Sequence, residues 1–164
     1  ERFRGLVAKS NRLEGDQSMH WNNGGWCLAT DACGNPIPGR LHKIQGLFVE
    51  EPTELELAQR RSIITKVAQL LDVGDDELDV FGSKFFPAFP GGTTVGWHQD
   101  AYFFGTSAGQ KVISCAVYLE ATDAENGCLQ VLPGSHLHGE IVPHAPGTGI
   151  WSQGEWAEVD SDKA

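Results

Sequence analysis

The sequence predicts a mainly β fold with helices, in which an antiparallel β core carries one packed helix. Three observations predict this class: one amphipathic helical stretch, several apolar segments of strand length after it, and turn residues between those segments. A helix followed by short strands joined by turns is typical of a double-sheet jelly roll. The pattern alone does not separate a sandwich from a barrel.

The N-terminal part of the chain contains loops and one candidate strand. Residues 1–16 carry too few apolar side chains to define a helical or strand face. Residues 20–26 are rich in Asn and Gly, which predicts a loop, and we expect Trp26 there to pack rather than to bind a ligand. Residues 41–49 alternate partly and form a strand or a loop edge. Lys43 in this segment is either solvated or, if it points inward, suited to a carboxylate.

The clearest helix follows over residues 53–71. Thr53-x-x-Glu56 is a capping-box signature at its start, and the apolar residues after it recur on one helical stripe as far as Leu71. Gly74 ends the pattern. We expect this helix to be structural and assign it no chemistry.

Three later segments have the composition of strands. Residues 78–86 are rich in Val and Phe, residues 111–120 form a continuous apolar run, and residues 128–132 alternate. Asn126-Gly127 is a favoured turn pair between the last two, and Pro133-Gly134 ends the final one. These segments predict the strands of the β core.

The composition limits the classes of function. The chain has 164 residues, which suits one core, so we expect residues 1–164 to form a single domain. The 12 Lys and Arg residues against 22 Asp and Glu residues give a net charge of −10, without a basic footprint for phosphate groups. We therefore expect neither a nucleic-acid partner nor an anionic membrane partner.

Cysteine usage and hydropathy bear on the compartment. No Cys-x-x-Cys pair and no zinc-ribbon spacing occurs among Cys27, Cys33, Cys115 and Cys128. Two of them lie in apolar runs, which is typical of small buried residues in a reducing compartment, with disulfides as the alternative. No apolar run approaches the roughly 20 residues of a membrane span, and no leader opens the chain. We expect an intracellular, cytoplasmic protein.

The strongest chemical signal is the triplet His98-Gln99-Asp100, which follows a glycine-rich loop. Side chains alternate faces along a strand, so His98 and Asp100 are expected to point to the same side and bind one ion. A histidine and a carboxylate are two of the three ligands in the 2-His-1-carboxylate set of non-haem Fe(II) oxygenases. A His-x-Asp triplet by itself is more often a surface feature without a metal.

The segments on both sides of this triplet are aromatic. Residues 85–90 form an apolar approach, and Tyr102, Phe103 and Phe104 follow. A few polar groups between aromatic segments are what a water-poor binding pocket requires. We interpret the three aromatic residues as candidates for the substrate-side wall, and core packing is an equally common role for them.

From Lys43 to about His144 the sequence resembles the phytanoyl-CoA dioxygenase family of Fe(II)- and 2-oxoglutarate-dependent oxygenases. The resemblance rests on three blocks in this order and at this spacing: Trp97 to Asp100, Cys115 to Leu119, and Glu125 to His136. It implies a double-stranded β-helix, which is a cupin-like jelly roll. It also implies hydroxylation of a small-molecule substrate, with 2-oxoglutarate and O2 consumed and succinate and CO2 released.

The resemblance implies roles for four residues. His98 and Asp100 match the first two iron ligands and are the expected catalytic pair, while Lys43 and Gln99 match residues that hold 2-oxoglutarate. Related halogenases have a small residue where Asp100 stands, so its carboxylate favours hydroxylation. The block from Leu132 to His136 looks like a structural turn beside the site.

Two functional residues of the family have no counterpart in this sequence. The family supplies its third iron ligand from a histidine on a later strand, and an arginine just beyond it pairs with 2-oxoglutarate. The last arginine here is Arg61. We interpret His136, His138 and His144 as solvent-exposed loop residues and assign none of them to iron.

We expect the chain to be an incomplete portion of such a domain, partly because it begins with Glu1 rather than methionine. One alternative is a truncated, non-catalytic jelly-roll paralogue that acts as a binding or scaffold protein. Another is a likeness of fold alone, since one fold hosts many functions.

Overall fold

The structure is a computed structural model that describes residues 2–10, 25–31, 33, 35–89, 95–104, 111–147 and 157–160. The chain divides into two compact units. The first unit comprises Glu1–Pro87 and Val112–Cys115, and the second comprises Ala88–Lys111 and Ala116–Ala164.

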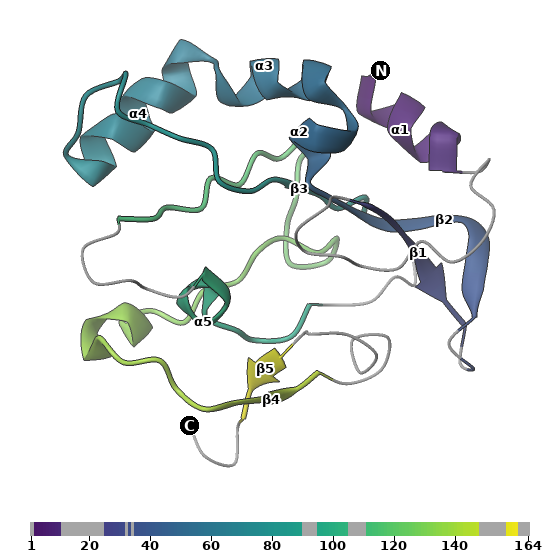
Figure 1. The fold of residues 1–164 in the computed structure, drawn as a ribbon. Helices are drawn as coiled ribbons and strands as arrows, with labels where there is room; N and C mark the ends of the chain where they lie inside the picture. Colours follow the sequence, from purple (N-terminus) through teal and green to yellow (C-terminus); the bar gives the residue numbers. More distant parts are fainter. Residues whose placement is uncertain are drawn as a thin grey trace. The chain divides into compact units, whose positions relative to one another are not determined.

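The first unit contains a three-stranded antiparallel sheet in the order β1-β2-β3 (Figure 1). Its strands are β1 (Gly25–Thr30), β2 (Pro36–Gln45) and β3 (Lys84–Phe85). The strand predicted around residues 41–49 is therefore present as far as Gln45, where Gly46 takes a left-handed conformation with φ of 69°. The strand predicted over residues 78–86 is reduced to two residues.

The core of the first unit lies where helix α1 (Arg2–Ser10) packs on the sheet. The buried side chains of this core are Leu6, Trp26, Leu41, Ile44 and Leu47. The indole of Trp26 is only 6% exposed, and its Nε1 donates to Glu50 Oε2 over 2.9 Å. The packing role predicted for Trp26 is confirmed. Burial of each large aliphatic side chain contributes about 1.5–3 kcal/mol.

An irregularity in β2 decides which side chains enter this core. Cys27 pairs with Lys43, but the next residue of β1, Leu28, pairs with Leu41, so His42 is an extra residue in β2. Such a bulge re-aims the residues on either side of it. Leu41 and Ile44 can therefore both face the core, while Lys43 points to the opposite side of the strand from Ile44.

The helix predicted over residues 53–71 is divided into shorter segments. The observed elements are α2 (Leu47–Glu50), the 3-10 turn η1 (Pro52–Glu54), α3 (Leu55–Ala58) and α4 (Arg61–Leu71). Arg60 is extended, with ψ of 129°, and separates α3 from α4. The single continuous helix predicted over residues 53–71 is therefore wrong, because the extended residue Arg60 interrupts it.

The end of α4 also differs from the prediction. Asp72, not Gly74, takes the left-handed position after Leu71, with φ of 56°. Val73 N then donates to Ala68 O over 3.1 Å and closes the last turn. None of the helices in the described ranges is both long and apolar enough for a transmembrane segment.

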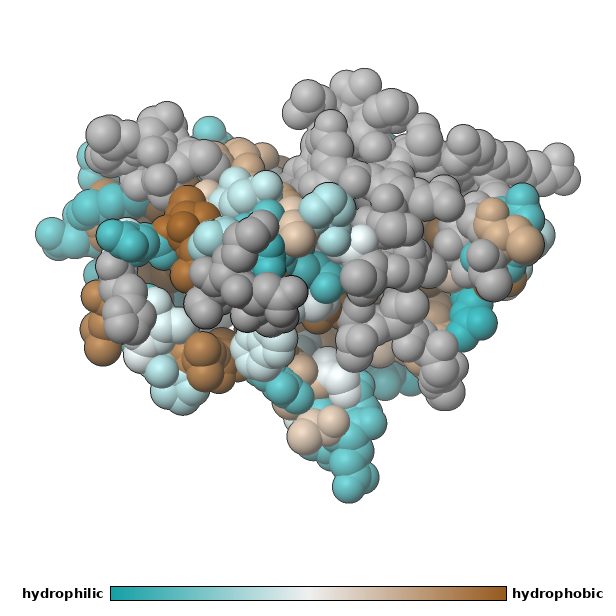
Figure 2. All heavy atoms as spheres, turned by 90° about the horizontal axis from the view of Figure 1, so that it is seen from below, coloured by the Kyte–Doolittle hydropathy of each residue, from teal (hydrophilic) through white to brown (hydrophobic). Residues whose placement is uncertain are grey.

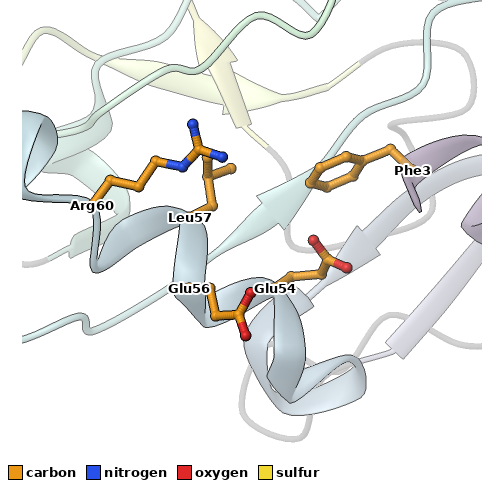
Figure 3. Close-up of a pocket in the computed structure, with 5 residues that line it drawn as sticks. All are labelled: Phe3, Glu54, Glu56, Leu57 and Arg60. Atoms are coloured by element: carbon orange, nitrogen blue, oxygen red, sulfur yellow. The ribbon is translucent and has the colours of Figure 1, made fainter. Parts of the chain in front are cut away.

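A pocket of about 270 Å³ lies in the first unit, beside α1 and α3 (Figure 3). Its lining residues are Phe3, Glu54, Glu56, Leu57 and Arg60. The buried carboxylate of Glu54 points toward the ring of Phe3. No residue predicted for the metal or 2-oxoglutarate site lines this pocket.

The second unit is built from shorter elements: α5 (Asp100–Phe104), the 3-10 turn η2 (Ser135–His138), β4 (His144–Pro146) and β5 (Ala157–Val159). β4 and β5 are antiparallel, with His144 opposite Val159. The β5 strand also binds the loop before α5, because Val159 N donates to Trp97 O over 2.7 Å. β5 thus joins β4 to the segment that carries His98.

The two strands predicted over residues 111–120 and 128–132 are not strands in the structure. Their apolar side chains are largely exposed, and Val131 reaches 74% exposure. Figure 2 shows hydrophobic side chains among hydrophilic ones on the face that it draws. An apolar run indicates a tendency to be buried, but a strand also has to pair with another strand, and neither segment belongs to the sheets that the described residues form. Antiparallel strands with packed helices are thus observed, and the jelly roll stays a prediction.

Candidate metal centre

The structure brings His98 and Asp100 together, although not by the predicted route. Residues 95–99 are irregular and Asp100 is the first residue of α5, so the expected strand alternation is absent. The turn into α5 places His98 Nε2 at 3.5 Å from Asp100 Oδ1. The two side chains are 25% and 47% exposed, respectively, so this pair faces solvent on one side.

The contacts of His98 define which ring nitrogen can bind a metal. His98 Nδ1 lies 2.9 Å from the carbonyl oxygen of Gly96, an arrangement that requires Nδ1 to carry the proton. In the neutral ring the lone pair is then on Nε2, which is the nitrogen that faces Asp100. Histidine ligands of metals usually donate their other ring N–H to such a carbonyl.

Gly96 lies in a confined position next to β5. A Cβ built on Gly96 would lie 2.6 Å from each carboxylate oxygen of Glu158. Any larger residue at position 96 therefore requires the Glu158 side chain to move. The close approach lets β5 bind the backbone of Trp97, immediately before His98.

The aromatic residues after the triplet pack against two histidines of the second unit, His98 and His144. The Phe103 ring meets the His98 ring edge-on, with 5.9 Å between centroids and an interplanar angle of 72°. Tyr102 stacks on His144 at 4.1 Å and 15°. Their role as a substrate-side wall stays a prediction.

His144 packs against Tyr102 and Phe103 and is half-buried, so the prediction that it is a solvent-exposed loop residue is wrong. The residue lies on β4, and its Nε2 accepts the backbone N–H of Gln99 over 3.2 Å. Its Nδ1 lies 2.8 Å from Val142 O, the same arrangement of proton and carbonyl as at His98. A histidine between Pro143 and Ala145 has no periodicity to indicate a site, since a contact across 45 residues places it there.

Gln99, predicted to line the 2-oxoglutarate pocket, lies between the two predicted ligands and binds a later segment. Its Nε2 donates to Glu140 O over 3.1 Å, and its Oε1 accepts the Val142 N–H over 2.8 Å. A side-chain amide has two protons and two lone pairs, so one of each stays available for a ligand.

The donor atoms at His98 and Asp100 suit Fe(II), since an imidazole nitrogen and a carboxylate oxygen are two of the three ligands of its usual set. Across the ranges that the structure describes, no three His, Cys, Asp or Glu residues are arranged to hold a metal ion. His136 is exposed on η2, as expected for a loop histidine. The assignment of His98 and Asp100 as iron ligands stays a prediction.

Lys43 lies in the first unit and points inward. It is 4% exposed, and its Nζ donates to Gln45 Oε1 over 3.4 Å. Burial lowers the pKa of Lys43, the neighbouring Cys27 acts in the opposite direction, and the charge of Lys84 lowers the pKa further. Of the two readings from sequence, the solvated one is wrong. A buried ammonium group suits a carboxylate ligand, which would compensate the cost of burying its charge.

All four cysteines are free, so the disulfide alternative is wrong. Cys27 is buried opposite Lys43, and burial raises the pKa of its thiol. Cys115, expected to be buried in an apolar run, is exposed instead because that run has no strand partner among the described residues.

Comparison with known proteins supports the sequence resemblance. The family model described as phytanoyl-CoA dioxygenase matches residues 52–162, which include His98, Gln99, Asp100 and His144 but not Lys43. Neither the curated proteins nor the solved structures gave a match. Because the match covers more than half of the sequence, the chain belongs to the phytanoyl-CoA dioxygenase family.

Proposed function

We propose that this chain is part of an Fe(II)- and 2-oxoglutarate-dependent dioxygenase that hydroxylates a small organic substrate and releases succinate and CO2. One observation carries the proposal: His98 Nε2 lies 3.5 Å from Asp100 Oδ1, in a chain of the phytanoyl-CoA dioxygenase family. An imidazole nitrogen and a carboxylate oxygen that are close enough to bind the same metal ion are ligands of Fe(II) in such oxygenases.

In this proposal His98 and Asp100 hold the iron. The bond between His98 Nδ1 and Gly96 O favours the tautomer in which Nδ1 carries the proton and Nε2 carries the lone pair. When bound, the iron together with 2-oxoglutarate and O2 supplies the oxidising chemistry, and the protein positions the reactants. Phe103, packed edge-on against His98, limits the access of water to that ring.

Lys43 and Gln99 are proposed to hold 2-oxoglutarate. The buried ammonium group of Lys43 would bind one carboxylate of this dianion in surroundings where charge-assisted bonds are strong. Such binding would raise the pKa of Lys43 back toward its ordinary value, because a nearby negative charge favours the protonated amine. Gln99 would contribute the remaining proton or lone pair of its amide.

Asp100 favours hydroxylation over halogenation, since its carboxylate takes the coordination position that a halide would need. We also propose that the antiparallel strands belong to a double-stranded β-helix. The net charge of −10 supports a small-molecule substrate and argues against nucleic acid or anionic membranes as partners. The cytoplasm is the proposed location.

The test is an anaerobic Fe(II) titration in the presence of 2-oxoglutarate, on this chain and on the complete gene product, monitored by the weak visible charge-transfer band of the chelate. His98→Ala should abolish both the band and Fe(II)-dependent succinate formation. His136→Ala, at an exposed histidine of the same unit, is the matched control and should change neither. Unchanged turnover in His98→Ala would remove His98 from the mechanism.

A second candidate function is a non-catalytic binding or scaffold protein. The observation in its favour is that no three His, Cys, Asp or Glu residues among those described are grouped to hold a metal ion. This candidate predicts no iron uptake by either protein at high concentration, and ligand affinity that a chelator does not change. A charge-transfer band in the complete gene product would eliminate it.

A further inference from the structure

The residue between the two predicted iron ligands is bound at every polar group that it has. Its side-chain amide binds Glu140 O and Val142 N over 3.1 and 2.8 Å, and its backbone N–H donates to His144 Nε2 over 3.2 Å. Its carbonyl accepts the Tyr102 N–H over 3.0 Å, in the first turn of α5. Three of these four contacts come from one segment, residues 140–144.

Residues 140–144 are in turn held by backbone hydrogen bonds and strand pairing with residues 159 and 160. Asp160 N donates to Pro143 O over 2.9 Å, and Val159 pairs with His144 across the β4–β5 ladder. Val159 N in turn donates to Trp97 O over 2.7 Å. These contacts connect four parts of the second unit in a ring: Gln99 binds β4, β4 pairs with β5, and β5 binds Trp97, which lies two residues before Gln99. We call this ring of contacts the circuit.

We propose that Gln99, Glu140, Val142 and His144 form a clasp that holds His98 and Asp100 in position to bind iron. The inference rests on the proposed function, and it makes Gln99 and His144 positioning residues. Because Gln99 is bonded to both ligands through the backbone, fixing its amide and its N–H fixes the two flanking Cα atoms. Supports of this kind orient the ligands before the metal arrives.

The orientation of His144 favours a positioning role over metal ligation. Its Nδ1 donates to Val142 O, so its only lone pair is on Nε2 and is directed at the backbone N–H of Gln99. The stacked ring of Tyr102 keeps the imidazole in this plane. To bind a metal, His144 would have to release Gln99 and open the clasp.

The test measures the Fe(II) affinity of the complete gene product by anaerobic titration calorimetry without 2-oxoglutarate, because Gln99 is also proposed to contact that co-substrate. Gln99→Met keeps the length of the side chain and removes both amide bonds, and His144→Phe keeps the stack on Tyr102 and removes both ring bonds. Each should weaken Fe(II) binding by roughly 10- to 100-fold, the usual effect of losing a partner of a metal ligand. The double variant should bind about as weakly as the weaker single variant, since both open one clasp.

Matched controls separate this effect from general destabilisation. Gln130→Met and His136→Phe make the same replacements at exposed positions of the second unit and should leave Fe(II) affinity unchanged. His98→Ala is the reference for the site itself. If His98→Ala abolishes binding while Gln99→Met and His144→Phe bind normally, the clasp is refuted and the proposed function stands. If His98→Ala also binds normally, both fail.

A measurement on the unaltered protein covers the case in which these variants do not fold. Nitrogen NMR of the metal-free protein should find His144 protonated at Nδ1, and Zn(II) as a diamagnetic probe should move the ring nitrogens of His98 but leave Nε2 of His144 unshifted. A metal-dependent shift of His144 Nε2 would make it a ligand and overturn the inference.

Discussion

His42, the extra residue in the bulge of β2, should make stability depend on pH. Burial and, secondarily, the positive charge of Lys43 lower the pKa of His42 from 6.5 to about 4. The ring also meets Phe86 edge-on, with 6.4 Å between centroids. The folded protein therefore keeps this imidazole neutral at pH values where the unfolded chain binds a proton.

The sign and size of the effect follow from this difference. Below pH 6.5 the unfolded chain takes up a proton that the folded protein does not bind until about pH 4, so the free energy of unfolding falls as the pH falls. A fall in pKa from 6.5 to about 4 corresponds to about 3 kcal/mol, which solvent screening at this half-buried ring reduces to about 1–2 kcal/mol. Above pH 6.5 this contribution is constant.

Urea unfolding at several pH values between about 4 and 7.5 measures it. The free energy of unfolding of the His42→Gln variant should fall less between pH 7 and pH 4 than that of the unaltered chain, by about 1–2 kcal/mol. His136→Gln, at an exposed histidine, controls for the loss of an imidazole elsewhere. An equally steep fall in His42→Gln and in the unaltered chain would refute the argument.

Three further predictions concern the first unit. Lys43→Met should raise the KM for 2-oxoglutarate at least about tenfold without lowering the melting temperature, because it removes a buried charge; an unchanged KM would exclude Lys43 from the co-substrate site. Alkylation followed by mass spectrometry should label exposed Cys33 before buried Cys27, whose thiol pKa is raised, and the reverse order would contradict the burial. In thermal unfolding, Gly5→Ala within α1 should add about 0.5–1 kcal/mol because its surroundings are open, while Gly46→Ala at φ of 69° should destabilise by about 1 kcal/mol or more. Equal melting temperatures for these two variants would be inconsistent with the backbone geometry.

Features that depend on neighbouring residues could be predicted from the sequence. His98 and Asp100 are two residues apart, so any compact turn brings them close, and they meet even though the expected strand is absent. The apolar stripe of α4 and its end near Leu71 are likewise local. The assignment of His98 and Asp100 as iron ligands stays a prediction.

Features that depend on distant partners could not be predicted. The position of His144 is set by Gln99, 45 residues earlier, and no local pattern indicates that contact. Leu41 and Ile44 share the core face only because of the bulge at His42, which appears only when β2 pairs with β1. For residues 111–120 the apolar composition predicted a strand, and that prediction was wrong. A strand forms only when a second segment pairs with it, and composition carries no information about that second segment.

The circuit that joins Trp97, Gln99, β4 and β5 has a consequence for the order of folding. Contacts across 41 to 45 residues cannot form until the later segment has been synthesised and has lost the entropy of loop closure. Non-local contacts of this kind slow folding, whereas the helices α3 and α4 need only near neighbours. If the clasp orients His98 and Asp100 as proposed, their alignment should therefore be among the last features to form, and iron binding should follow the folding of the second unit.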